Sequence, residues 1–176
     1  MSRYYDDDPG EEFPNQYALW QANADRALKG RRGRQALRDL RDALLALPEK
    51  KLIDGAMCTV PRRDGDGRSD PWGFDPAAGH GEGVCAIGAY LWHRQVKAGM
   101  DPAEAFDSLP TLDDENYDLS ETALLAKSEA GMAYTLAWEL AYRNDETYRS
   151  KTPEERYTAF LAWIDAELGE PAESAP

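Results

Sequence analysis

The chain has 176 residues, of which 42% are apolar, and a formal net charge of −13 at pH 7. That length and apolar fraction suffice for one domain with a hydrophobic core, so they exclude a disordered chain despite a mean hydropathy of −0.69. The sequence contains no run of 18 apolar residues, and its acidic start, MSRYYDDDPGEEF, lacks the apolar stretch of a secretory signal. We therefore expect no membrane span and a cytoplasmic location.

The first third of the chain predicts an acidic flexible tail followed by two helices. Residues 1–14 are rich in Asp, Pro and Gly, which predicts the tail. A first helix is expected over 15–29, interrupted by Gly30 and Gly33, and a second helix then continues to residue 47, before Pro48. Leucines spaced three and four residues apart predict that this second helix packs one stripe into the core: Leu37, Leu40, Leu44 and Leu47.

The central third predicts little regular structure. Two short apolar runs, 52–53 and 56–60, flank Asp54 and Gly55, a pattern that predicts at most one small β-hairpin near 52–60. Residues 61–83 are rich in Gly, Asp and Pro and predict a long loop, a kind of segment that is often functional.

The last half predicts four helices. They are expected over 84–98, ended by Gly99; over 101–108, with Asp101 as N-cap; over 120–143; and over 153–168, opened by the capping box of Thr152 and Glu155. Residues 170–176 are expected to form a second flexible tail. We therefore predict a mainly α fold: a single compact domain of about six helices over residues 15–169.

The charge is divided unevenly along the chain. Nine of the 20 Lys and Arg residues lie between Arg26 and Lys51, opposed by three acidic residues, so this block carries about +6 and the rest about −19. Such a division favours binding of a charged partner. The candidate binding residues are expected to lie exposed opposite the leucine stripe: Arg31, Arg32, Arg34, Arg38 and Arg41.

Three partners or roles are open for this basic block. An acidic protein surface is the favoured partner, and the chain's own acidic face in a homodimer is a second form of the same idea. Phosphates of a nucleic acid are a weaker alternative, because the charge of −13 on the whole chain repels nucleic acid at long range. A solvated helix face without a partner is the third interpretation.

Cys85 is the one candidate for an enzymatic nucleophile. It lies at a predicted helix start, where the helix dipole lowers the pKa of a thiol. His93 lies eight residues further along the same predicted helix, about 12 Å away, and His80 lies in the preceding loop. A cysteine hydrolase is therefore the alternative function, and a buried apolar Cys85 is the favoured interpretation.

No cofactor or metal site is predicted. Cys58, His80, Cys85 and His93 are suitable zinc ligands, but they lack the close Cys and His pairs of zinc sites. The loop over 64–75 has neither the sixth-position Gly nor the twelfth-position Glu of a calcium loop. The acidic cluster over 113–121 is explained by a following helix, whose N-terminus favours acidic residues.

Two segments carry a family resemblance. Residues 30–53, GRRGRQALRDLRDALLALPEKKLI, and the block that runs from GVCAIGAY to WELAYRNDETYRSKTPEERYTAFLAWI resemble small acidic proteins of actinobacterial bacteriophages. That family has no assigned activity, so the resemblance implies a setting only: expression in the bacterial cytoplasm. The sequence thus leads us to expect a non-enzymatic phage accessory protein that binds a host or phage protein through the basic helical patch. A nucleic-acid-binding regulator that uses the Arg26–Lys51 block remains an alternative, as does the Cys85 hydrolase.

Overall fold

The computed structural model describes residues 14–53, 58–59, 83–110, 119–147 and 151–169. The predicted tails, the loop over 61–82 and most of the acidic cluster lie outside the described residues. The described part forms seven α-helices, which confirms the mainly α prediction. The helices are α1 (Pro14–Lys29), α2 (Arg31–Ala46), α3 (Ala86–Lys97), α4 (Pro102–Asp107), α5 (Leu119–Ala130), α6 (Tyr134–Tyr142) and α7 (Pro153–Leu168). A π-helical turn, η2 (Arg143–Thr147), extends α6.

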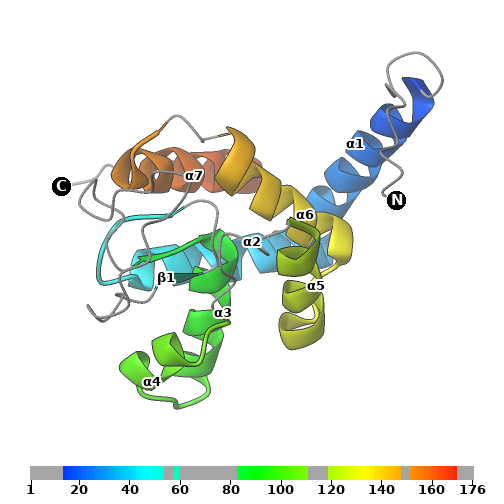
Figure 1. Ribbon diagram of the computed structural model, residues 1–176. Helices are drawn as coiled ribbons and strands as arrows, with labels where there is room; N and C mark the ends of the chain where they lie inside the picture. The colour runs from blue at the N-terminus through cyan, green and yellow to red at the C-terminus, as the bar shows by residue number, and fades with distance from the viewer. Residues whose placement is uncertain (1–13, 54–57, 60–82, 111–118, 148–150, 170–176) are drawn as a thin grey trace, which may run out of the picture.

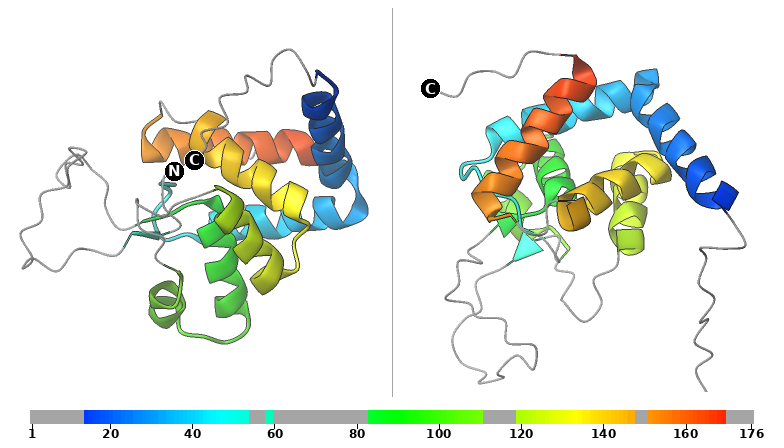
Figure 2. Two further views of the ribbon diagram at one scale, coloured as in Figure 1. Left: turned by 45° about the vertical axis from the view of Figure 1, so that its right-hand side comes forward. Right: turned by 90° about the horizontal axis from the view of Figure 1, so that it is seen from above.

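Helix α2 is the centre of the arrangement. Helix α7 packs on one side of α2 and α3 on the other, while α1 contacts α2 and α6 (Figure 1). Helix α1 projects from one end of the molecule and α4 lies at the opposite end (Figure 1 and the left view of Figure 2). The predicted leucine stripe is buried, since Leu37, Leu40 and Leu44 are at most 1% exposed. Their burial holds α2 against the rest of the core.

The junction of α1 and α2 differs from the prediction at Gly33. Only Gly30 interrupts the helices, and Gly33 lies within α2, where it is buried. A Cβ atom at Gly33 would overlap the backbone carbonyl of Ala27 in α1. Gly33 is therefore present because α1 approaches the α2 backbone closely, and not because the helix must end there.

The predicted long helix over 120–143 is two helices. Helix α5 ends at Ala130, Gly131 adopts a φ of 66°, and α6 begins at Tyr134. The amide of Gly131 donates to the carbonyl of Lys127, a bond typical of a helix end with a left-handed glycine. A glycine inside an apolar helical pattern was the available signal for this break.

The predicted hairpin near 52–60 has a different pairing. Within that range the strand β1 (Cys58–Thr59) is present, but its antiparallel partner is β2 (Gly83–Val84), with Cys58 opposite Val84. Ile53 also donates a backbone hydrogen bond to Val84. A strand distant in sequence thus replaces the expected neighbour, because pairing beside α3 buries Val84 and Ile53 in the core.

Local capping signals predicted the helix ends well. Thr152 and Glu155 form the expected reciprocal capping box at the start of α7, and Gly169 ends that helix with a φ of 68°. Asp101 accepts hydrogen bonds from the amides of Ala103 and Glu104 and so caps α4. These signals act through bonds within four residues, which is why they are legible without tertiary structure.

Candidate functional site

The five candidate arginines of α2 divide between two faces of that helix. Arg34 and Arg41 are partly buried and face α7, whereas Arg31, Arg32 and Arg38 are exposed. The prediction of one exposed patch of five arginines is therefore corrected. The physical reason is rotation around the helix, because Arg34 and Arg41 lie about 60° from Arg31 and Arg38, far enough to reach a neighbouring helix.

Arg34 and Arg41 bind the C-terminal half of α7. The Nη2 atom of Arg34 donates to the carbonyl of Leu168 at 2.8 Å, which satisfies a carbonyl of the last turn of α7. The Nε atom of Arg41 donates to the carboxylate of Asp165 at 2.6 Å, and Asp165 is buried. Both contacts bring a positive charge to the negative end of α7, so these two arginines stabilise the fold.

The remaining three arginines form what we call the basic surface: Arg31, Arg32 and Arg38. All three are exposed, and Arg31 and Arg38 lie within about 20° of each other around the helix, two turns apart. The start of the surface adjoins the end of α1, where Arg26 and Lys29 are also exposed. Positive side chains thus gather where α1 meets α2.

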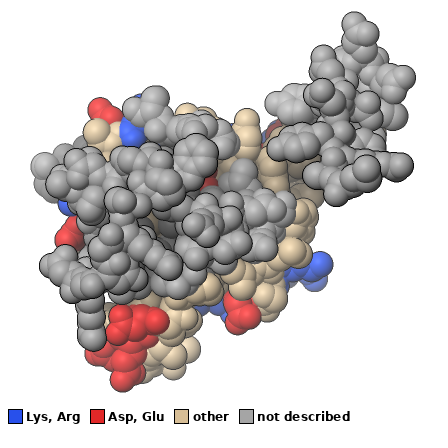
Figure 3. Space-filling model, viewed as in Figure 1, with Lys and Arg blue, Asp and Glu red and all other residues tan. Residues whose placement is uncertain are grey.

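An acidic surface lies at the other end of the molecule. The exposed side chains of Asp101, Glu104 and Asp107 belong to α4 or its cap. Red atoms gather over α4 in the space-filling view (Figure 3). Helix α4, which carries this acidic surface, lies at the opposite end of the molecule from α1.

Cys85 is the N-cap of α3 and is buried, with 1% of its surface exposed. Its Sγ atom accepts a hydrogen bond from the amide of Gly88 at 3.4 Å. The helix start was predicted and the burial was the favoured interpretation. An enclosed sulfur in a cap position has no approach for a substrate in this conformation, which disfavours the hydrolase. The side chain of Cys58 and all of His80 lie outside the described residues.

A buried polar junction lies beside Cys85 and was not predicted. Asn144, in the π-helical turn, is fully buried: its Oδ1 accepts from the amide of Ala86, and its Nδ2 donates to the carbonyl of Ile53 at 2.8 Å and to Asp145. Arg156 of α7 is buried as well, and its Nη1 donates to the carbonyl of Leu52 at 2.7 Å.

These bonds join four segments: the chain at 52–53, the start of α3, the turn η2 and α7. The side-chain amide of Asn144 uses both of its N–H donors and its oxygen acceptor in these hydrogen bonds. We therefore assign the junction a structural role, since it satisfies buried backbone groups that no helix pairs. The adjacent polar residues Asn144 and Asp145, which follow an apolar helix, were the only sequence signal of this junction.

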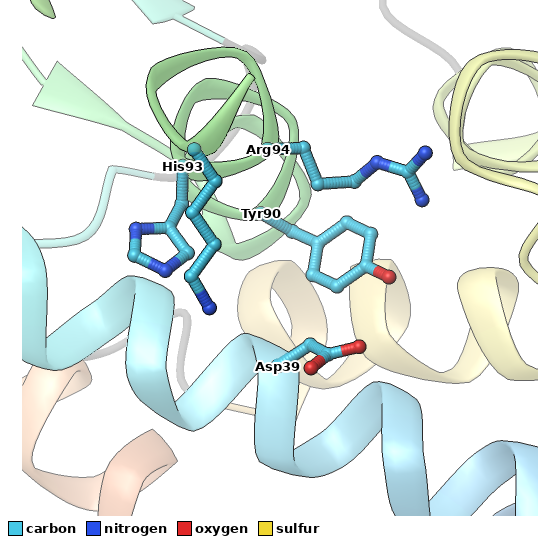
Figure 4. A pocket seen from close by; sticks show the side chains of 5 residues that line it. Asp39, Tyr90, His93 and Arg94 are labelled. Atoms are coloured by element: carbon cyan, nitrogen blue, oxygen red, sulfur yellow. The ribbon is translucent and has the colours of Figure 1, made fainter. Parts of the chain in front are cut away.

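A cleft of about 170 Å³ lies between α2 and α3 (Figure 4). The described residues that line it are Asp39 from α2 and four residues of α3: Tyr90, His93, Arg94 and Lys97. Their spacing of three and four residues, which puts polar groups on one helix face, was the signal that the sequence offered. The Tyr90 ring lies above Asp39 in this view.

His93 is the titratable group of this cleft with a shifted pKa. Burial lowers the pKa of His93 below its ordinary value, and the charge of Lys97 lowers it further, while Asp42 and Asp39 partly oppose the shift. Its Nε2 atom is buried and has no hydrogen-bond partner in the structure. Burial and the charge of Lys97 thus favour the neutral imidazole of His93.

A larger, mostly apolar cleft of about 380 Å³ lies between the end of α2, α3 and α4. Trp92 and Phe106 line it, and the indole of Trp92 is held by a 3.0 Å hydrogen bond to the carbonyl of Pro102. This apolar cleft is lined by Gly83, which directly follows the residues over 60–82 that lie outside the described part of the chain.

Two negative findings concern the described residues alone. In that part of the chain, no three His, Cys, Asp or Glu side chains lie close enough together to hold a metal ion. None of its helices combines the length and the apolar character needed to cross a bilayer.

The chain was compared with protein-family models, with curated proteins and with solved structures, and no match was found in any of the three. The site must therefore be interpreted from its own geometry and charge.

Proposed function

We propose that this chain is a non-enzymatic accessory protein that binds an acidic partner protein through the basic surface. The observation that carries the proposal is the exposure of Arg31, Arg32 and Arg38 on a helix that two other arginines fix in place. Guanidinium groups suit recognition of carboxylates, because their planar fork of donors matches the two carboxylate oxygens.

The setting of the proposal comes from the resemblance to small acidic proteins of actinobacterial bacteriophages. It places the protein in the bacterial cytoplasm, with a host or phage protein as partner. The net charge of −13 on the whole chain supports a protein partner over nucleic acid, since it repels a phosphate backbone at long range.

A capture experiment with matched variants tests the proposal. Tagged protein is incubated with host lysate and the captured partner is identified by mass spectrometry; its affinity is then measured against purified variants. We expect Arg31→Ser/Arg38→Ser to weaken binding at least about tenfold, since two charge-assisted contacts are lost. The control Lys127→Ser/Lys151→Ser removes the same charge from exposed sites elsewhere and is expected to leave affinity within about twofold.

Two results would replace the proposal. If the captured material is nucleic acid, and its binding falls steeply with salt and is lost in Arg31→Ser/Arg38→Ser, the basic surface binds phosphates instead. If both double variants bind the partner equally well, the basic surface is a solvated helix face and the function lies elsewhere on the molecule.

A further inference from the structure

The α2–α3 cleft lies next to the basic surface. The Nζ atom of Lys97, which lines the cleft, is 3.7 Å from the carboxylate of Asp42 on α2. Asp42 follows Arg38 by one helical turn, and Asp39, which also lines the cleft, is the residue after Arg38. Arg38 of the basic surface is thus next in sequence to a residue that lines the cleft, and one turn from the partner of Lys97.

The cleft offers hydrogen-bond donors for an anionic group. Lys97 has three donors and contacts one carboxylate, that of Asp42; Arg94 has five, and its Nη1 donates to the carbonyl of Ala130 at 2.8 Å. Both side chains are exposed enough to turn toward a ligand. The acidic residue in the lining, Asp39, already accepts from Gln35 at 3.0 Å.

The size of the cleft restricts its ligand. A volume of about 170 Å³ is close to the roughly 150 Å³ of a cavity that accepts benzene. One short side chain fits, whereas a nucleotide or a helix does not. We propose that this cleft receives a single carboxylate side chain, Asp or Glu, of the protein that docks on the basic surface, held by Lys97 and Arg94. The inference rests on the proposed function and names the anchor of that partner.

A bound carboxylate would also change His93. A negative charge beside the imidazole favours its protonated form, so binding opposes the effect of burial and of Lys97 and raises the pKa of His93. The groups that face His93 are Asp39 and Asp42 of α2 and Lys97 of its own helix. The imidazole resonances of His93 therefore respond to occupancy of the cleft.

The first test uses a small probe. Nα-acetyl-glutamate methylamide is titrated into the full chain, the imidazole resonances of His93 are followed by NMR, and the uncharged glutamine analogue serves as control. We expect chemical-shift changes that saturate with the glutamate probe only. In Lys97→Gln the affinity for that probe should be about tenfold weaker. Lys127→Gln, which removes an exposed charge outside the cleft, should leave the response unchanged. Shifts that do not saturate, or that both probes produce equally, overturn the inference.

The second test separates this inference from the proposed function. With the captured partner in hand, Lys97→Gln and Arg31→Ser/Arg38→Ser are compared. Loss of affinity in both supports an anchor in the cleft. Loss only in the arginine variant leaves the basic surface as the docking site and overturns the cleft inference. Loss only in Lys97→Gln keeps the cleft and overturns the basic surface, and no loss in either overturns both.

Discussion

Two pairs of arginines on α2 have the same spacing and different environments. Arg34 and Arg41 are seven residues apart and bind α7; Arg31 and Arg38 are also seven residues apart and are exposed. The two pairs differ by three residues in sequence, or about 60° around the helix axis. Whether an arginine of α2 is partly buried against α7 or exposed therefore depends on its position around the helix.

The largest effect is expected from Gly33→Ala, which displaces the helix that carries both pairs. The new methyl group would overlap the carbonyl of Ala27, so α1 and α2 must separate. We expect a loss of about 3 kcal/mol or more in the free energy of unfolding, measured by urea denaturation. Gly30→Ala is the matched control, since its Cβ would be 3.2 Å from the nearest atom outside its neighbours. Equal stability of the two variants would contradict the close approach of α1.

Arg41→Ala should show the effect of breaking the contact with α7. It leaves the carboxylate of Asp165 buried without this partner, so we expect a loss of about 2–3 kcal/mol, less than for a fully buried pair because Arg41 is partly exposed. The double variant with Asp165→Asn should lose less than the sum of the single losses. Strict additivity would show that the two side chains do not interact.

Arg34→Ala should have a smaller effect. It removes hydrogen bonds to backbone carbonyls at the end of α7 but leaves no buried charge alone. We expect a loss of about 1 kcal/mol, which thermal unfolding can detect. Arg34→Lys, which keeps the charge near the helix end, should recover part of that loss through the dipole. A full recovery would mean that the positive charge of Arg34, and not its forked hydrogen bonds, accounts for its contribution to stability.

The outward pair should matter least for stability. Arg31→Ser/Arg38→Ser is expected to change the free energy of unfolding by less than about 0.5 kcal/mol, because exposed charges contribute little. The same urea series used for Arg41→Ala provides the measurement. A loss comparable with that of Arg41→Ala would mean that the outward arginines also hold the fold together, and the contrast between the pairs would disappear.

The smallest expected effect is a dependence of stability on pH. The folded state lowers the pKa of His93, so the unfolded state binds more protons below the ordinary value of 6.5. Stability due to His93 is therefore complete above that pH and declines as the pH falls through 6.5. His93→Gln should show a smaller decline between pH 7.5 and 5.5 in urea midpoints than the parent chain.

Much of the fold was predictable because its signals are local. The leucine stripe of α2, the capping box of Thr152 and Glu155, and the N-cap Asp101 act within one or two helical turns, and each lies where it was predicted. Two errors arose at glycines, because a glycine in a helical pattern is compatible with more than one structural role. Gly33 was interpreted as a helix break although it marks a close approach, and Gly131 was interpreted as helical although it ends α5.

The candidate site was predictable only in part. The density of charge between Arg26 and Lys51 indicated a basic surface on α2, and the helical period indicated that the arginines avoid the core. The cleft beside it was missed, because its lining comes from α2 and α3, which are some fifty residues apart in sequence. No local pattern places Asp39 opposite Tyr90.

Most of the helices, their caps and the uneven distribution of charge could be predicted from the sequence, since each of these depends on neighbours along the chain. Which charged side chains are internal depends on the packing of the helices. Arg34 and Arg41 become part of the fold because Leu168 and Asp165 of α7 lie beside them, and Arg31 and Arg38 stay exposed because α7 lies on another side of the helix. The fate of a charged side chain depends on the desolvation and the partners that packing supplies, and packing joins residues that are distant in sequence.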